Sequence, residues 1–259
     1  MSCRSPLCFA LLLSLSIGSR AHELACAGMF AASDISAQRQ FAPERQVDIL
    51  HLALDVTPLW LDQAVEGTAT FTFKALPTRT HELILHGHDL RISQVRSTRE
   101  LEGYQNTGEE IIFTFKEPLP SEGEHRHSID YKAFPERGLY FRTAAMGYKP
   151  EDEHIYTQGE PTEARHWYPS YDSPNEKFTS EIYCRVPEEM VVLSNGRLVS
   201  EENLGNGLKA VRWLQDKPHV NYLISLVAGH FKKVEDEYRG IPLVFYTPSS
   251  EIQYAGNFF

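Results

Sequence analysis

The segment Ala64-Val-Glu-Gly-Thr-Ala-Thr-Phe-Thr-Phe-Lys74 alternates polar and apolar side chains over its second half. Threonines occupy positions 68, 70 and 72, and apolar residues occupy positions 69, 71 and 73. Successive side chains of an extended chain point to opposite faces, so all three threonines fall on one face and the apolar residues on the other. The sequence therefore predicts a half-buried β-strand over residues 64–74.

Similar strand-like runs recur on both sides of this segment, each bounded by Gly, Pro, Ser or Asn residues typical of turns. They cover residues 46–56, 82–95, 110–115, 125–134, 179–186, 191–199, 208–214, 222–227, 231–238 and 241–246. Turns are predicted at Ser194-Asn-Gly196 (or a bulge), at Leu204-Gly-Asn-Gly207 and at Arg239-Gly240. The predicted fold class is all-β, a large saddle-like β-sandwich of about a dozen strands.

The only helix expected within this β pattern is short and lies near residues 161–168. Pro161 suits the first position of a helix, and the charge of Glu163 suits its first turn. Close to the end of the sequence, Tyr254 and Phe258 lie four residues apart, as on the apolar face of a second helix.

The N-terminus has the features of a secretory signal peptide over residues 1–21. Arg4 precedes an apolar run at 7–18, and Ser19-Arg20-Ala21, with small residues at 19 and 21, offers a cleavage site. The run is too short to span a bilayer comfortably, and no membrane span is predicted in the mature chain. The protein is therefore expected to be secreted or periplasmic.

Residues 22–44 show no sustained period and are predicted to form a flexible leader. A competing interpretation is a lipoprotein signal that uses Cys26 after Leu24-Ala25, but Glu23 stands where such signals carry an aliphatic residue. The chain has four cysteines, and removal of the signal leaves Cys26 and Cys184. Two cysteines do not make a disulfide framework, so Cys184 is predicted to be a small buried residue, while pairing with Cys26 stays open.

The chain is acidic, with a formal net charge of −10 over 259 residues. Nucleic-acid binding is not expected, because phosphate groups are neutralised by Lys and Arg. An acidic surface is compatible with a site for cationic amines.

Candidate functional residues lie in the stretch Tyr156-Thr-Gln-Gly-Glu-Pro-Thr-Glu-Ala-Arg-His-Trp-Tyr-Pro-Ser-Tyr-Asp-Ser-Pro-Asn-Glu-Lys-Phe178. If this part of the chain is extended, Gln158 and Glu160 share one face, and Gly159 between them leaves room for a ligand. An amide and a carboxylate so placed could hold a cationic amine. The alternative interpretation is that Glu160 stabilises the dipole of the short helix that follows it.

This stretch resembles the zinc aminopeptidases of the aminopeptidase N and leukotriene hydrolase family. The resemblance covers roughly residues 45–248. The matching blocks are Thr157-Gln-Gly-Glu160, Ala164-Arg165, Tyr171-Asp-Ser-Pro174, Lys177-Phe178 and Leu193-Ser-Asn-Gly196.

The resemblance implies that residues 45–248 form an N-terminal β domain that leans over the active site. Glu160 matches the family glutamate that binds the free α-amino group of a peptide, and Gln158 matches the glutamine that lines the first side-chain pocket. Residues 249–259 then correspond to the start of a missing catalytic domain. Peptide N-termini are the implied partners, held together with that domain.

The family's zinc motif, His-Glu-x-x-His on a helix, is absent from the sequence. The nearest string, His81-Glu-Leu-Ile-Leu-His86, is one residue too long and lies in a strand-like segment, where positions five apart face opposite sides. We therefore assign no catalytic or metal-binding residue. Zinc is expected only in the missing domain, and the chain alone is predicted to be inactive.

Two functions follow as hypotheses. The first is a substrate-anchoring domain of a secreted zinc metallo-aminopeptidase. The alternative is a standalone extracytoplasmic β-sandwich that binds ligands without catalysis, with Trp60, Tyr104 and Trp213 as an exposed stacking surface.

The other conspicuous residues near the candidate site are given structural roles. Asp172-Ser-Pro174 is predicted to be a turn, and Arg165 and Lys177 to pair with Asp172 or Glu163. The aromatic residues Trp167, Tyr168 and Tyr171 are assigned to the core. His125-Arg-His127, next to Gly and Glu residues, is predicted to be a solvated loop end.

Overall fold

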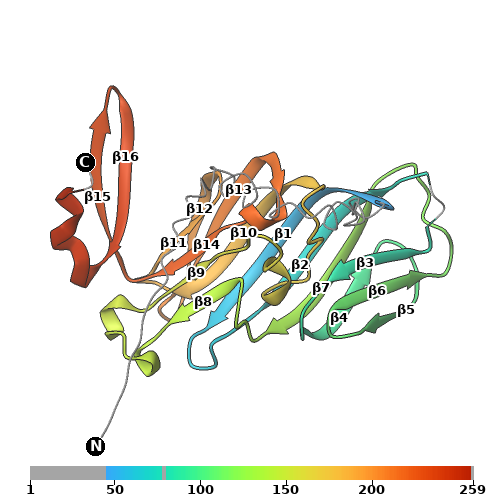
Figure 1. Cartoon of the computed structure of the whole chain (residues 1–259), viewed down its shortest axis with the longest axis horizontal. Helices are drawn as coiled ribbons and strands as arrows, with labels where there is room; N and C mark the ends of the chain where they lie inside the picture. The colour runs from blue at the N-terminus through green and yellow to red at the C-terminus, as the bar shows by residue number, and fades with distance from the viewer. Residues whose placement is uncertain (1–44, 78–79, 258–259) are drawn as a thin grey trace, which may run out of the picture. The chain divides into compact units, whose positions relative to one another are not determined.

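The computed structural model describes residues 45–77 and 80–257, with side chains up to Tyr254. The predicted signal peptide (1–21), the predicted leader (22–44) and Cys26 lie outside the described residues. Within the described part of the chain, sixteen strands form four sheets (Figure 1). An all-β, sandwich-like fold is therefore confirmed.

The largest sheet has seven strands in the order β12-β13-β10-β1-β2-β7-β4. Its strands are β1 (Val47–Leu59), β2 (Ala64–Ala75), β4 (Arg91–Ser97), β7 (His125–Ala133), β10 (Lys177–Pro187), β12 (Arg197–Gly205) and β13 (Leu208–Val220). Neighbours run antiparallel except β1 and β10, which are parallel and pair His51 with Thr179. The first strand is thus joined to the strand that follows the candidate functional stretch.

The segment that predicted a strand is confirmed as β2. Ala69, Phe71 and Phe73 are completely buried, while Thr68 and Thr72 on the opposite face are half-buried. The alternation corresponds to one face packed on the core and one face closer to solvent.

A bulge in β1 explains why both faces of that segment are partly apolar in sequence. The register with β2 shifts between Ile49 and His51, so that Leu50 is an extra residue in the pair. The buried positions are Val47 and Ile49 before the shift and Leu52 and Leu54 after it. One added residue moves the following side chains to the other face, which keeps apolar groups on the core side throughout.

The remaining strands form three smaller sheets. The four-stranded sheet has the order β11-β14-β9-β8, the three-stranded sheet β3-β6-β5, and β15 pairs with β16. Their bounds are β3 (Glu82–His86), β5 (Leu101–Asn106), β6 (Glu110–Phe115), β8 (Leu139–Arg142), β9 (His154–Thr157), β11 (Val191–Ser194), β14 (Leu226–Gly229), β15 (Phe231–Tyr238) and β16 (Ile241–Pro248).

Helical structure in the described residues consists of short 3-10 segments. These are η2 (Ala144–Met146), η3 (Pro150–Asp152), η4 (Ala164–His166), η5 (Asn221–Leu223) and η6 (Ser249–Asn257). None of the helices in this part of the chain has the length and apolar character needed to cross a membrane. The helix pattern near the end of the sequence thus corresponds to η6 up to Asn257, with Phe258 outside the described residues.

The predicted turns are present. Leu204-Gly-Asn-Gly207 joins β12 to β13, with Asn206 and Gly207 at positive φ, and Arg239-Gly240 joins β15 to β16 in the same conformation. Ser194-Asn-Gly196 is a turn rather than a bulge, and it carries the chain from the four-stranded to the seven-stranded sheet.

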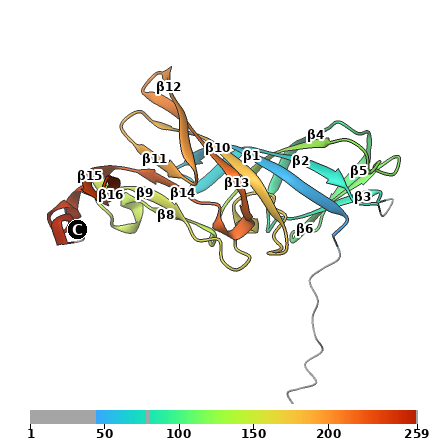
Figure 2. The ribbon, with the colours of Figure 1, turned by 90° about the horizontal axis from the view of Figure 1, so that it is seen from above.

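The prediction of a solvated loop at His125-Arg-His127 is wrong. These residues begin β7, and both imidazoles are buried, His127 completely. The His127 ring lies against Phe113 of β6, with centroids 4.2 Å apart, so the three-stranded sheet packs against this end of the large sheet (Figure 2). The alternation within β7, buried at 125, 127, 129 and 131, outweighs the polar character of the histidines.

Cys184 is confirmed as a small buried residue. It is a free thiol in the middle of β10, and burial raises its pKa to about 12. Such a thiol stays protonated and acts as an apolar group in the core.

Candidate functional site

The candidate anchor residues lie on a loop and not in a strand. β9 ends at Thr157, and the chain then turns through residues 158–163, here called the anchor loop. Gln158 and Glu160 are both exposed, and Gly159 between them is buried. The expectation of an extended strand through Glu160 is wrong, so a common face for the two side chains stays a prediction that strand geometry no longer supports.

The backbone of the anchor loop is bonded at both ends. The Gln158 N–H donates to the Gly138 carbonyl (2.9 Å), and the Glu163 N–H donates to the Gly159 carbonyl (2.9 Å). These bonds give buried backbone groups their partners where no sheet is available to supply them. The loop therefore has a defined path despite lying outside any strand.

Gly159 is required by a neighbouring backbone. A Cβ atom at this position would lie 2.6 Å from the carbonyl oxygen of Tyr222 and 3.1 Å from its Cα. The space left by the missing side chain is thus filled by η5, and not reserved for a ligand as the sequence suggested. Gly159 allows η5 and the anchor loop to touch backbone to backbone.

Behind the anchor loop lies a buried chain of polar side chains. The Tyr168 hydroxyl donates to Asn221 Oδ1 (2.6 Å), and Asn221 Nδ2 donates to Asp172 Oδ1 (2.8 Å). Arg165 Nε donates to Asp172 Oδ2 (2.9 Å), which confirms the predicted pairing of Arg165 with Asp172. The Asp172 side chain is 1% exposed, so these partners are what make its burial tolerable.

Asp172 also explains why the expected helix at 161–168 is only the single 3-10 turn η4. The Arg165 N–H donates to the Asp172 carboxylate and therefore does not form a helical bond to an earlier carbonyl. Trp167 and Tyr168 are both fully buried, as the core assignment predicted, and consecutive buried residues do not suit a helix with one apolar face. Burial and the nearby Asp172 charge hold the pKa of Tyr168 well above its usual value, so it remains a neutral donor.

His86 belongs to the same polar chain and not to a metal site. It ends β3, and its Nδ1 accepts a hydrogen bond from the Asp172 N–H (3.1 Å). Burial, followed by the positive charge of Arg165, lowers the pKa of His86 and favours the neutral acceptor. His81 is exposed and precedes the strand. Within residues 45–77 and 80–257, no group of three or more His, Cys, Asp or Glu side chains could hold a metal ion.

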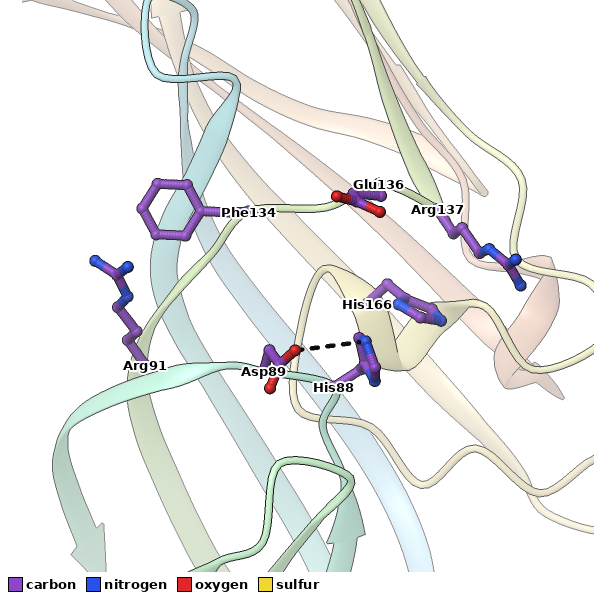
Figure 3. Close-up of a pocket in the computed structure, with 7 residues that line it drawn as sticks. All are labelled: His88, Asp89, Arg91, Phe134, Glu136, Arg137 and His166. Atoms are coloured by element: carbon purple, nitrogen blue, oxygen red, sulfur yellow. Dashed lines mark ion pairs between the residues drawn. The ribbon is translucent and has the colours of Figure 1, made fainter.

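A hollow of about 610 Å³ lies beside η4, which contributes His166 to its lining (Figure 3). It is lined by His88, Asp89, Arg91, Phe134, Glu136, Arg137 and His166. The rings of His88 and His166 lie side by side at one end, with centroids 4.6 Å apart, and Arg91 covers the ring of Phe134 at the other.

The charges in this hollow are mixed and largely matched. His88 Nδ1 lies 2.8 Å from Glu109 Oε1, and His166 Nε2 lies 3.3 Å from Glu163 Oε2. Burial, followed by the neighbouring His88, lowers the pKa of His166. Neither Gln158 nor Glu160 lines the hollow, so the hollow is not part of the candidate anchor.

The aromatic surface proposed for a binding module is not assembled. Trp60 packs edge-on against Phe141, and Trp213 donates its indole N–H to the Val192 carbonyl (3.0 Å). Both indoles are partly buried against the core, and only Tyr104 is exposed, at 46%. A flat stacking platform needs exposed rings. Trp60 and Trp213 do not provide them, so two of the three proposed residues are not available for stacking.

Comparison with known proteins places the whole of this site within one family profile. The Peptidase M1 N-terminal domain matches residues 46–223, which include the anchor loop, its polar support and η5.

Individual relatives agree with that match. Glutamyl aminopeptidase of Rattus norvegicus is 26% identical over 226 residues, which are 80% of this chain and 24% of that protein. Aminopeptidase N of Acetobacter pasteurianus is 34% identical over 95 residues, 37% of this chain and 27% of that protein. The chain thus spans about a quarter of the length of these relatives.

Solved structures share the fold. Aminopeptidase A of Legionella pneumophila, in complex with aspartic acid, superimposes with a TM-score of 0.70 and 22% identity over 82% of this chain and 25% of that one. The M1 zinc metallopeptidase of Deinococcus radiodurans gives a TM-score of 0.65 at 20% identity, covering 76% of this chain and 45% of that one.

Proposed function

Since the chain belongs to the Peptidase M1 N-terminal domain family, we propose that it is the substrate-anchoring part of a secreted zinc aminopeptidase. In this proposal Glu160 accepts hydrogen bonds from the free α-ammonium group of a peptide, and Gln158 lies beside the first side chain. The peptide is thereby held by its amino end, which sets the register of the chain.

The observation that carries the proposal is the free carboxylate of Glu160. It is exposed, and none of the described residues forms a hydrogen bond or an ion pair with it. Its neighbours are engaged: Glu163 lies beside His166 and Arg137, and Asp172 pairs with Arg165. Glu160 is thus the acid of this stretch that remains available for an ammonium ion.

The strength of such an anchor depends on its surroundings. An exposed carboxylate holds an ammonium group by about 0–1 kcal/mol. A charged hydrogen bond that is shielded from water contributes about 1.5–3 kcal/mol. We therefore expect weak binding by the chain itself and stronger binding where a second surface covers the site.

The described residues do not fit a zinc ion, because no suitable cluster of ligands is present among them. The proposal therefore places zinc in a further domain and assigns this chain no step of the hydrolysis. The predicted signal peptide supports an extracytoplasmic location.

The test is an NMR titration of the chain with leucinamide, which carries a free ammonium, and with N-acetyl-leucinamide, which does not. We expect larger fast-exchange shifts of the amides of residues 158–163 with leucinamide than with N-acetyl-leucinamide at the same concentration. The Glu160→Gln variant keeps the shape of the side chain and removes its charge, so its response to leucinamide should fall to the level seen with N-acetyl-leucinamide.

Glu188→Gln is the matched control, because Glu188 is another exposed acid in a turn and should be neutral to the change. Equal shifts with both ligands, or an unchanged response in Glu160→Gln, would show that Glu160 does not recognise the ammonium group.

A further inference from the structure

We infer that Asn221 is a positioning residue for the anchor loop: its amide bonds hold η5, and η5 fixes Gln158 and Glu160 by backbone contact at Gly159. The inference rests on the proposed anchoring function and adds a residue from outside the candidate stretch. Asn221 itself touches no substrate in this account.

The side-chain amide of Asn221 forms hydrogen bonds through both its oxygen and its nitrogen. The side chain is 2% exposed, its oxygen accepts from the Tyr168 hydroxyl, and its nitrogen donates to Asp172. Both partners come from the candidate stretch, 53 and 49 residues earlier in the chain. A buried amide with directional bonds to two fixed partners has one orientation, and the backbone that carries it is fixed with it.

The next residue transmits this position to the anchor loop. The carbonyl oxygen and Cα of Tyr222 lie 2.6 and 3.1 Å from the position that a Cβ of Gly159 would take, so the two backbones are in contact without an intervening side chain. Backbone atoms cannot swing aside as a flexible side chain can. A shift of η5 must therefore displace Gly159 and the two exposed residues that flank it.

A second bond ties the first residue of β14, three residues beyond the end of η5, to the same place. The Leu226 N–H donates to Thr157 Oγ1 (2.9 Å), at the end of β9 and directly before Gln158. The segment from Asn221 to Leu226 is thus fixed to the polar chain at one end and to β9 at the other. The anchor loop begins at one of these points and touches η5 at Gly159.

Positioning matters here because the anchor is weak. An exposed ion pair gains little, and part of that gain is lost when flexible groups must be ordered on binding. A loop that is already ordered loses less conformational freedom when the ammonium binds. Release of the loop should therefore weaken binding without changing any group that contacts the ligand.

The experiment compares wild type, Asn221→Leu and Tyr168→Phe with a control, Phe113→Leu, which perturbs the core at β6 far along the chain from the anchor loop. Leucinamide affinity is measured by NMR at a temperature where every variant is folded. Backbone ¹⁵N relaxation of residues 158–163 is measured on the same samples. Tyr168→Phe keeps the ring and removes one hydrogen bond, so it serves where Asn221→Leu does not fold.

Asn221→Leu and Tyr168→Phe are the two network variants. We expect both to bind leucinamide at least three-fold more weakly than wild type and to show lower order parameters in the anchor loop. The control, Phe113→Leu, should keep the wild-type affinity and the wild-type order parameters even where it loses as much thermal stability as the network variants. Unchanged loop order in the network variants, or an equal loss of binding in the control, would overturn the inference. Absence of binding in the wild type would instead refute the anchoring function, while the relaxation data would still decide whether Asn221 orders the loop.

Discussion

His127 is the residue whose environment differs most from what its chemistry suggests. Its ring is completely buried between Phe113 and the strands of the large sheet, and neither ring nitrogen has a hydrogen-bond partner among the described residues. Burial lowers the pKa of His127 from 6.5 to about 4. A neutral imidazole here is tolerated as an aromatic group, whereas an imidazolium would be a buried, unpaired charge.

This predicts acid sensitivity of a definite sign. The unfolded chain takes up a proton at His127 near pH 6.5, and the folded chain only near pH 4, so stability is fully present above pH 6.5 and falls as the pH drops between these values. When the pH falls from 7 to 4.5, the free energy of unfolding should drop in both proteins. The drop in His127→Phe should be about 2–3 kcal/mol smaller than the drop in wild type. Urea unfolding at the two pH values measures the difference.

His81→Phe is the control, because His81 is exposed and its replacement should leave the wild-type pH dependence in place. The explanation fails if His127→Phe and wild type lose stability in parallel. Burial lowers the pKa of His51, His86, His166 and His219 as well, so only the difference between variant and wild type reports on His127.

Asp172 offers a second test at the level of single residues. Asp172→Ala removes the common partner of Arg165, Asn221 and the η4 backbone, and leaves the buried Asn221 amide without an acceptor. We expect a loss of about 2–4 kcal/mol in the free energy of unfolding. The exposed Asp216→Ala should change it by less than about 0.5 kcal/mol, and a similar effect of both substitutions in urea unfolding would contradict the role given to Asp172.

At the scale of elements, two glycines provide a matched pair. Gly138 and Gly123 both have positive φ (76° and 84°), so alanine strains the backbone at either one. A Cβ at Gly138 would lie 2.0 Å from the Glu163 carbonyl oxygen, whereas at Gly123 nothing lies within 4 Å. Gly123→Ala should cost about 1 kcal/mol from the backbone alone.

Gly138→Ala should be destabilised by about 2 kcal/mol more than Gly123→Ala, because the added Cβ forces the chain before β8 and the anchor loop apart. This difference is the magnitude expected for severe overpacking. Chemical denaturation of both variants gives the comparison. Equal losses would show that the close approach of Gly138 to Glu163 can relax at little cost.

Elements with a strong local period could be predicted from the sequence. The alternation of Phe71 and Phe73 with threonines identified β2, and the Asn-Gly and Arg-Gly turns identified two hairpins. The sheet order could not be predicted, because the parallel pairing of β1 with β10 joins residues 128 positions apart. No local pattern specifies such a partner.

The errors near the candidate site share this cause. The anchor loop turns where Gly138 and Tyr222 contact it, and the helix does not extend back from η4 toward residue 161 because Asp172 accepts the Arg165 N–H. Asn221 was missed because a lone Asn in a largely apolar run carries no signal, and its partners lie far away in sequence. Glu160 is a candidate because of a sequence motif and its role stays a prediction, while the contacts around it are ones that only the fold brings together.

For the whole molecule, the fold is that of an M1 N-terminal domain, and the described residues lack a cluster that could hold zinc. The proposal that hydrolysis belongs to a further domain predicts that the chain alone does not hydrolyse peptides. An aminoacyl-anilide assay with the purified chain, with and without added Zn²⁺, should show no release above the buffer rate. Zinc-dependent release that persists after repeated purification would contradict the assignment of hydrolysis to a further domain.

The central claim is that Glu160 recognises a free ammonium group, and the most direct measurement is the affinity ratio of leucinamide to N-acetyl-leucinamide in wild type and in Glu160→Gln. One exposed ion pair contributes up to about 1 kcal/mol, so the wild type should prefer the free amine by up to about five-fold. The ratio should fall to one in Glu160→Gln. A preference of the same size in both proteins would show that the ammonium is held elsewhere, and the proposed anchor would be wrong.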